Sequence, residues 1–444
     1  MIARLQERWA DVRSSWWFLP SVMALGAVLI SVITTTLDSA FSDELEQGFG
    51  LYGGGPEGSR SVLETVAGSM ITVAGVTFSI AIVVMTLASS QFGPRLLRTF
   101  MRSVGNQVTL GTFVATFIFS VLVLRTVRTE DGDQAAFVPH LSVSVAMLLT
   151  LASLTVFIYF IHHSARSLQV GQIVAAVSRD MEKALDDLFP GMIGEDGAGE
   201  EPEQEASGGV PLTSEQSAYV QMINGRELLS ATNERDVVVE LAVAPGDFVL
   251  EGATLAYVRP AERLDEDLSR RLRRAISLGD QRTEQQDVGF AFDQLQQICL
   301  RALSPALNDP LTAGMCIDRM AAGLARLAES ELPSRHRLDD DGSLRVLAEP
   351  PSLEAMLRTA FADVRRSARD NVAASLRLLQ ALGAVGARAS RPEDLAALRG
   401  SAVLIVEEAS PSLTAEDLAL LGEAQRAALA VIDGAVREPP PLRS

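Results

Sequence analysis

Cysteine, histidine and lysine are nearly absent from this 444-residue chain, which has two cysteines, four histidines and one lysine, Lys183. Cys299 and Cys316 form no disulfide framework and fit no zinc-binding pattern, so we expect reduced, buried thiols. His162 and His163 close an apolar run, where an interfacial position is more common than metal binding. The sequence therefore predicts no metal site.

Enzyme signatures are also missing. The chain has no GxxxxGK[ST], no GxSxG, no HExxH and no dinucleotide fingerprint after a strand. Asp287 and Asp309 are candidates for paired carboxylates, but helix polarity and capping explain each of them separately. The formal charge of −18 comes without a basic patch in the polar half, which argues against nucleic-acid binding. We expect a protein that is not an enzyme and carries no cofactor.

Long apolar runs, by contrast, are abundant before residue 164, and hydrophobic residues make up 48% of the chain. A bilayer is crossed by about 20 apolar residues. Four segments reach that length: 17–37, 66–91, 107–127 and 139–163. The sequence thus predicts a membrane protein in contact with the lipid bilayer, with a four-span domain over residues 1–163.

The arginines indicate how the spans are oriented. Six of them lie before the first span or between the second and third: Arg4, Arg8, Arg13, Arg95, Arg98 and Arg102. The 38–64 connection is mainly acidic. The positive-inside rule therefore places both termini in the cytoplasm. The last three arginines share one face just inside the membrane and are candidates for binding anionic lipid headgroups, or for lining a cytoplasmic mouth.

The cytosolic part begins with an expected stalk helix over 164–192. Its apolar residues are spaced by four and three, as in a coiled coil: Val170, Val174, Val177, Met181, Ala184 and Leu188. The alternative is a helix packed on its own domain. We expect an acidic linker at 193–209, a small β-module at 210–260, a helical domain at 261–437 and a disordered tail at 438–444.

The β-module is predicted from alternating, β-branched stretches punctuated by Asn-Gly and Pro-Gly. Within it, PGDFVLEGATLAYV looks like the hairpin of biotinyl- and lipoyl-type barrel-sandwich modules. The only lysine lies outside this segment, so a swinging-arm carrier is excluded. The helices expected after it cover roughly 262–277, 283–303, 310–330, 352–385, 392–409 and 414–436. The fold class is mainly α, with a four-helix transmembrane domain, a barrel-sandwich-like β-module and a helical cytosolic domain.

One break between predicted helices, ALSPALNDPLTAG at 302–314, stands out because it holds two prolines. Ser304–Pro305 and Asp309–Pro310 each fit a capped helix start with proline at the first helical position. We expect a helix end, one tight turn and a new capped helix. Capping does not account for Asn308 or Thr312.

The same stretch carries a family resemblance. RALSPALNDPLTA, the upstream RTEQQDVGFAFDQLQQI and the membrane segment MITVAGVTFSIAIVVMTLASSQFGPRLLRTFM closely resemble a bacterial family of predicted membrane proteins, domain of unknown function twenty-two fifty-four. The resemblance covers essentially the whole chain. It implies the architecture and a bacterial inner-membrane location, and it supplies no activity.

Two sets of residues are candidates for a functional site in the cytosolic part. A ligand pocket would combine Arg282, Gln286, Asp287, Asn308 and Thr312. Alternatively, the break around Ser304, Asn308, Asp309 and Thr312 is a hinge or a subunit contact.

The second span offers the sharper feature, a helical face rich in hydroxyl groups. The pore-lining candidates on it are Ser69, Thr72, Ser79, Thr86 and Ser90. A separate face repeats alanine every seven residues, at Ala67, Ala74, Ala81 and Ala88. Small and hydroxyl residues commonly serve only to pack membrane helices closely. The alternative is a hydroxyl-lined pathway on the axis of an oligomer, with the alanines packing neighbouring copies.

These observations lead to two functional hypotheses. The first is a homo-oligomeric inner-membrane protein that forms a passive ion channel or pore gated by its cytosolic domain, because no ionisable residue lies in the middle of a span. The second is a membrane-anchored sensor or scaffold without transport activity, whose spans only anchor and associate. Besides the bilayer and further copies of the chain, an ion or a small ligand is a candidate partner of the protein.

Overall fold

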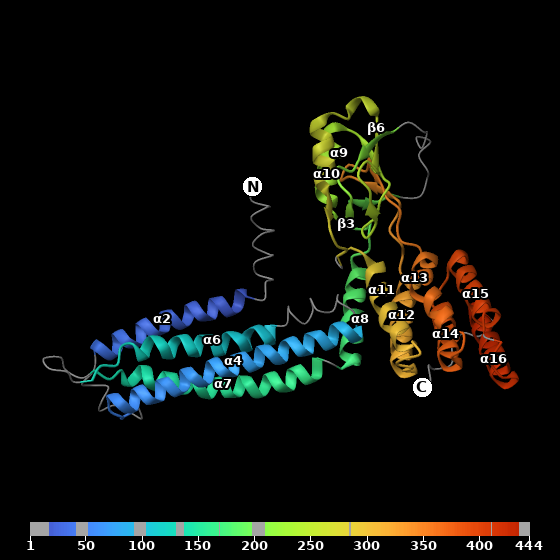
Figure 1. The fold of residues 1–444 in the computed structure, drawn as a ribbon. Helices are drawn as coiled ribbons and strands as arrows, with labels where there is room; N and C mark the ends of the chain where they lie inside the picture. The colour runs from blue at the N-terminus through green and yellow to red at the C-terminus, as the bar shows by residue number, and fades with distance from the viewer. Residues whose placement is uncertain are drawn as a thin grey trace. The chain divides into compact units, whose positions relative to one another are not determined.

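The computed structural model describes residues 17–40, 52–92, 104–129, 137–167, 169–197, 209–283, 286–409 and 411–434. For 87–92 and 165–167 the description covers the backbone alone. The described chain is mainly helical with a small sheet region (Figure 1). It divides into two compact units, Met1–Gln172 and Ile173–Ser444.

Among the described residues, four helices of the first unit are long and apolar enough to cross a membrane, and each overlaps one of the predicted spans. They are α2 (Phe18–Ala40), α4 (Pro56–Phe92), α6 (Val104–Leu124) and α7 (His140–Ser167). α4 begins well before the predicted 66–91 segment. Pro56 fits its first position, because an N–H there would have no partner within the helix.

α6 is the central helix of this unit. Half of the residues in the most apolar stretch of α6 are buried. The corresponding share is 22% for α2 and α7 and 28% for α4. Phe113 and Phe119 are fully buried along it. Gly111 brings α2 close, since a Cβ there would lie 2.6 Å from the Sδ of Met23 and 3.1 Å from the Cα of Pro20. The packing of α6 thus fixes which faces of the other three helices stay outside.

Polar contacts fix one end of this bundle. The carboxylate of Asp38, at the end of α2, accepts hydrogen bonds from the amides of Leu141 (2.8 Å) and Ser142 (3.0 Å) and from the Ser142 hydroxyl (2.6 Å). These amides belong to the first turn of α7 and have no partner within the helix. The amide of Tyr52 donates to the Ser144 hydroxyl at 2.9 Å. α2, α7 and the segment before α4 are therefore joined at this end.

All but the first three residues of α8 (Val170–Asp186), the predicted stalk helix, belong to the second unit. Its Val174, Val177, Met181 and Ala184 are all buried within the chain. Met181 lies against Gly323 of α12 (Pro310–Glu329), where a Cβ would come 2.5 Å from its Cε. The predicted coiled-coil seam is wrong, because its own domain already covers it. The alternative, a helix packed on its domain, is correct.

In the part of the chain that the structure describes, nine short strands form two sheets. The six-stranded sheet has the order β1 (Glu195–Asp196), β8 (His336–Leu338), β9 (Leu344–Leu347), β4 (Val238–Leu241), β6 (Thr254–Arg259) and β2 (Val210–Thr213). The three-stranded sheet has the order β5 (Phe248–Val249), β3 (Ala218–Ile223) and β7 (Ile276–Gly279). All neighbours are antiparallel except β4 and β9.

The small sheet region is confirmed, but the predicted hairpin within it is wrong. β5 pairs with β3, whereas β6 pairs with β2 and β4, so the two halves of PGDFVLEGATLAYV lie in different sheets. β1, β7, β8 and β9 also join the sheets from outside the expected 210–260 segment. Short strands far apart in the chain find partners by pairing that no local pattern reveals.

A buried arginine explains why the 190s belong to this region rather than to a linker. Arg337 on β8 is 1% exposed. Its guanidinium donates to the carbonyls of Ile193, Gly194 (2.7 Å) and Gly191 (3.2 Å), and it pairs with Asp196. A buried charge needs such partners. The start of the predicted 193–209 linker therefore belongs to the edge of the six-stranded sheet. Residues 198–208 lie outside the described chain.

The remaining helices mostly follow the prediction. They are α9 (Gly225–Arg235), the 3-10 helix η1 (Ala261–Arg263), α10 (Glu266–Ala275), α11 (Val288–Ala302), α12, α13 (Leu353–Ala368), α14 (Val372–Gly386), α15 (Pro392–Glu407) and α16 (Ala415–Ile432). The predicted helix over 352–385 is in fact two helices. The side chain of Asn371 accepts from the amide of Ala374 at 3.0 Å and so starts α14 anew.

Candidate functional site

The hydroxyl face of α4 lies on the outside of the four-helix unit. Ser69, Thr72, Ser79 and Thr86 are all exposed, and their side chains contact no other helix of the unit through a hydrogen bond that the described residues show. Exposed Thr65 extends the face by one turn, so that Thr65, Thr72, Ser79 and Thr86 recur every seven residues. The structure does not describe the side chain of Ser90, the fifth predicted pore-lining residue.

The alanine face of α4 points the other way. Ala67, Ala74 and Ala81 are only 7%, 6% and 5% exposed. Ala74 packs with Leu110 and Phe113 of α6 in one apolar cluster. The expectation that these alanines pack neighbouring copies is therefore wrong, because α4 uses them to approach α6 within one subunit.

Several hydroxyls of the exposed face are bonded to their own helix. Ser69 donates to the carbonyl of Thr65 at 2.6 Å, Thr72 to that of Gly68 at 2.8 Å and Thr86 to that of Ile82 at 2.9 Å. This bond satisfies the proton of each hydroxyl without water. Each oxygen keeps a lone pair directed away from the helix, available to an ion, a water or another helix.

The hydroxyls of the third span behave differently. Thr109, Thr116 and Ser120 on α6 are fully buried within the unit. Thr116 lies 3.1 Å from the hydroxyl of Ser153 on α7. Thr116 therefore joins α6 to α7 within one subunit, whereas the hydroxyl groups of Ser69, Thr72, Ser79 and Thr86 on α4 face outward. Arg95, Arg98 and Arg102, the headgroup candidates, lie outside the described residues.

In the second unit, three predicted residues gather where α11 begins. Both carboxylate oxygens of Asp287 accept from Arg282, at 2.7 and 2.9 Å, and Asp287 also accepts from the amide of Phe290 at 3.0 Å. Arg282 also bonds to Asp293, at 2.5 Å. Gln286 pairs its amide with the backbone of Ile223, at 2.8 and 3.1 Å. The group thus caps α11 and ties it to the end of β3.

These three residues line a cleft of about 500 Å³. Its other walls include the Pro245–Asp247 turn and the Pro350–Pro351 segment. Gly246 has φ +100°, and a Cβ there would lie 2.3 Å from the Oδ2 of Asp287. Burial raises the pKa of Asp287, although its bonds to Arg282 oppose that effect. Arg282 and Asp287 already have each other and further partners, so the cluster serves structure first.

The hinge residues lie elsewhere. α11, with 15 residues, separates Asn308 and Thr312 from Arg282 by about 22 Å of helix. The structure therefore does not bring the five predicted pocket residues together. It divides them between the two ends of α11.

At the hinge, capping explains more than the sequence suggested. Asp309 accepts from the amide of Thr312 at 3.1 Å and from its hydroxyl at 2.5 Å, and these bonds lower the pKa of Asp309. Asn308 is exposed and has φ +43°, a conformation that asparagine tolerates better than most residues. Ser304 does not cap a helix start as predicted. Its hydroxyl donates to the carbonyl of Arg301 at 2.7 Å, at the end of α11.

Metal-binding and thiol chemistry find no support in the described part of the chain. It holds no group of three or more His, Cys, Asp or Glu side chains that could bind a metal ion. Cys299 and Cys316 are free and fully buried, and burial raises the pKa of Cys299 to about 12. Both thiols are therefore unreactive at neutral pH.

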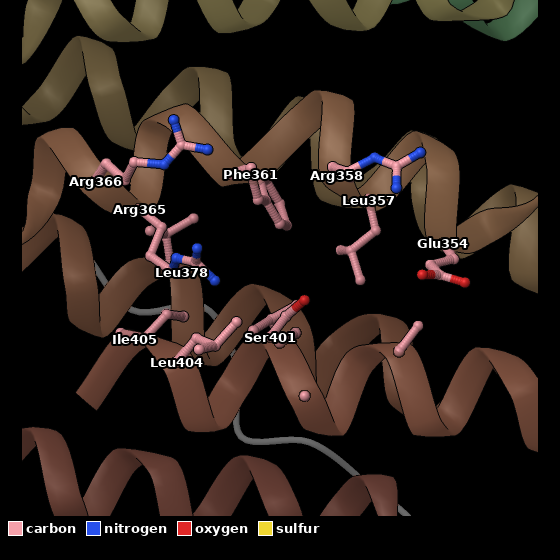
Figure 2. Close-up of a pocket in the computed structure, with 14 residues that line it drawn as sticks. Glu354, Leu357, Arg358, Phe361, Arg365, Arg366, Leu378, Ser401, Leu404 and Ile405 are labelled. Atoms are coloured by element: carbon pink, nitrogen blue, oxygen red, sulfur yellow. The ribbon is translucent and has the colours of Figure 1, made fainter. Parts of the chain in front are cut away.

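Sequence reasoning missed one further cavity, between α13 and α15 (Figure 2). Its volume is about 390 Å³, and Arg358, Arg365 and Arg366 line it together with apolar side chains. The sequence did contain a signal for the cationic part of this cavity. Arg365 and Arg366 follow Arg358 by seven and eight residues, which places all three on one side of a helix. The small residues Gly400 and Ser401, which form the opposite wall, gave none.

Comparisons with known proteins agree with the membrane architecture. The family model described as "Predicted membrane protein (DUF2254)" matches residues 13–384. The chain is 33% identical over 435 residues to an uncharacterized protein of Mycobacterium bovis, covering 96% of this chain and 82% of the relative. An uncharacterized protein of Mycobacterium tuberculosis matches with the same identity and coverage. No solved structure matches the chain significantly.

Proposed function

The chain belongs to the family of predicted membrane proteins DUF2254, and we propose that it forms a homo-oligomeric, passive ion channel in the bacterial inner membrane, gated by its cytosolic domain. The observation that carries this proposal is the outward face of α4. Thr65, Thr72, Ser79 and Thr86 recur there every seven residues and are exposed on the unit. Water or a second helix can offer hydrogen-bond partners to the oxygens of such a face, whereas lipid tails offer none.

Glycines on the same side of α4 support association of copies through this helix. Gly68 and Gly75 are exposed, and a Cβ at either would meet nothing within 4 Å. Small residues spaced in this way let membrane helices approach closely. A seven-residue repeat also suits helices that cross at about 20°, the geometry of left-handed bundles. Copies of α4 arranged in this way would surround an axis with hydroxyl oxygens.

The type of transport follows from what the face lacks. From Thr65 to Gln91 the sequence holds no acidic or basic side chain. Proton-coupled carriers and pumps use such groups inside the membrane. Hydroxyl oxygens can replace part of the hydration shell of an ion without binding it tightly. Passive conduction is the transport mode that fits this chemistry.

The proposal includes the orientation of the chain, with both termini in the cytoplasm. Its support is the arginine distribution along the connections. On this orientation the second unit, Ile173–Ser444, is cytosolic and available to gate the pathway.

One observation favours the second candidate, a membrane-anchored sensor or scaffold. Thr72 and Thr86 donate to carbonyls of their own helix, as hydroxyls do when they face lipid or a packed helix. In that case the face of α4 is a dry contact between copies. The two candidates differ in whether water reaches the face.

Cysteine accessibility separates them. Both native cysteines are buried, so a single introduced cysteine reports its own surroundings. We expect Thr72→Cys and Ser79→Cys in oriented membranes to react with a water-soluble, charged methanethiosulfonate. Ile71→Cys, at an exposed position off the face, is the control and should not react. Protection of all three cysteines would favour the anchor.

A further inference from the structure

The cavity between α13 and α15 combines an apolar floor with a cationic side. Figure 2 shows Leu357 and Phe361 of α13 directed toward the space between the helices, with Ser401 of α15 facing them. Leu378 and Leu382 of α14 also line the cavity and are buried. The floor therefore offers apolar contact over several turns of helix.

The cationic side comes from α13. Arg365 is only 15% exposed and reaches Glu408 through its Nε at 3.0 Å. Arg358 is exposed and forms no ion pair within the described chain, although Glu354 lies one turn before it and also lines the cavity. Arg366 is bonded to Asp363 at 2.7 Å. Among the residues that line the cavity, three are arginines and one, Glu354, is acidic. Glu408 and Asp363 pair with Arg365 and Arg366 from outside the lining, and Arg358 has its donors available.

The cavity is open because the opposite wall is small. α15 contributes Ala397, Gly400 and Ser401 there, and a Cβ on Gly400 would meet nothing within 4 Å. Larger residues at these positions would fill the space between the helices. The volume of about 390 Å³ falls in the range of about 300–1,000 Å³ that is typical of small-molecule sites.

We propose that this cavity binds a single-chain amphiphilic anion, with its acyl chain on the leucine and phenylalanine floor and its acidic head on Arg358 and Arg365. Guanidinium groups bind carboxylates and phosphates through paired hydrogen bonds. The apolar floor selects against small inorganic anions. This inference is independent of ion conduction, since it rests on the second unit alone.

The proposal makes separate predictions for the acidic head and for the acyl chain of the ligand. Decanoate and decyl phosphate share the required chemistry, whereas decanol lacks the charge and should bind at least about tenfold more weakly. Each added methylene should raise the affinity about fourfold until the floor is covered. Comparison of decanoate with decyl phosphate identifies the preferred head.

The test uses the full chain in nanodiscs of zwitterionic phosphatidylcholine. A diazirine-bearing decanoate is photolysed, and labelled peptides are identified by mass spectrometry. We expect saturable labelling within 353–368 and 392–407 that decanoate competes away. Gly400→Leu should abolish this labelling, because leucine fills the cavity while improving the helix propensity over glycine. Gly314→Leu, at a helical glycine with equally open surroundings, should leave it unchanged.

Arg358→Gln should weaken labelling at least about tenfold, with Arg369→Gln outside the cavity as the control. Thermal unfolding confirms that each variant is folded. Labelling that survives Gly400→Leu would overturn the proposal. So would a wild-type protein that the diazirine-bearing decanoate leaves unlabelled in this region. If an acidic amphipathic peptide cross-links there instead, the cavity is a protein-docking surface.

Discussion

The carboxylate of Asp287 occupies the space that a side chain on Gly246 would need, with Oδ2 2.3 Å from the ideal Cβ position. Two features thus require glycine at 246, this close approach and the backbone angle φ of +100°. Gly246→Ala should displace Asp287 from Arg282 and lower the free energy of unfolding by more than about 2 kcal/mol. Thermal or urea unfolding of the fragment 173–444, the second compact unit, measures this loss.

Gly252→Ala is the matched control. Gly252 also has positive φ, +82°, but a Cβ there meets nothing within 4 Å. This variant should lose only the backbone part, about 1 kcal/mol. Equal losses at the two positions would show that Asp287 does not depend on the close approach.

The hinge makes a prediction about stability and pH. Asp309→Ala removes the cap of α12 and the bond to the Thr312 hydroxyl, so it should cost about 1–2 kcal/mol at pH 7. The folded-state pKa of Asp309 is lowered, so its contribution is present above the unfolded value of about 3.9 and is lost as the pH falls through the folded value. The difference between wild type and variant should therefore shrink below about pH 4 in urea unfolding. A difference that grows on acidification would contradict this assignment.

Substitutions of the neighbouring Asn308 should change the stability through the backbone conformation and not through lost contacts. With φ +43° and an exposed side chain, Asn308→Gly should be neutral, whereas Asn308→Val should cost about 1–2 kcal/mol. The melting temperature of the same fragment distinguishes these outcomes. A large loss with glycine would mean that the Asn308 amide has a structural partner.

The packing of α8 gives a fourth prediction. Met181 is fully buried against Gly323 and Phe292, so Met181→Ala should cost about 2–5 kcal/mol through the cavity it leaves. The oligomeric state of the full chain, measured by light scattering with detergent correction, should not change. Dissociation of the oligomer without loss of stability would revive the coiled-coil interpretation.

The orientation is tested by reporter fusions. Fusions at residues 50 and 133 should report the periplasmic side, and those at 100 and 205 the cytoplasmic side, because the arginines lie mainly before the first span and between the second and third. A cytoplasmic report from residue 50 would contradict the charge argument and the cytosolic placement of the second unit.

The features that local chemistry decides were predictable from the sequence. The apolar length of the spans and the Asp309–Pro310 start of α12 were both correct. Arg282, Gln286 and Asp287 also lie together, since they are neighbours at one helix start. The break before α14 was missed because neither proline nor glycine marks it, and an Asn371 cap looks like any polar residue within a helix.

What remained out of reach depends on partners distant in the chain. β7 looks like the end of α10 until it pairs with β3, more than 50 positions earlier. The sequence showed the hydroxyl face and the alanine face of α4, but it could not tell which of the two lies inside the subunit. The packing of Ala74 against α6 is what assigns the alanine face to the interior and leaves Thr72 and Ser79 outside.

Ion flux through proteoliposomes tests the channel most directly. Ser79→Leu should reduce the flux of the wild-type protein severalfold or more and leave assembly intact, because a side chain lining a pathway has space in front of it. Thr155→Leu is the matched control, at an exposed hydroxyl that belongs to α7 and not to α4, and should conduct like wild type. Ala81→Leu should instead destabilise the subunit, since Ala81 is buried within it. If wild-type protein passes no ion from a panel of cations and anions, and Ser79→Leu dissociates the oligomer, the face of α4 is a packing surface and the channel proposal is contradicted.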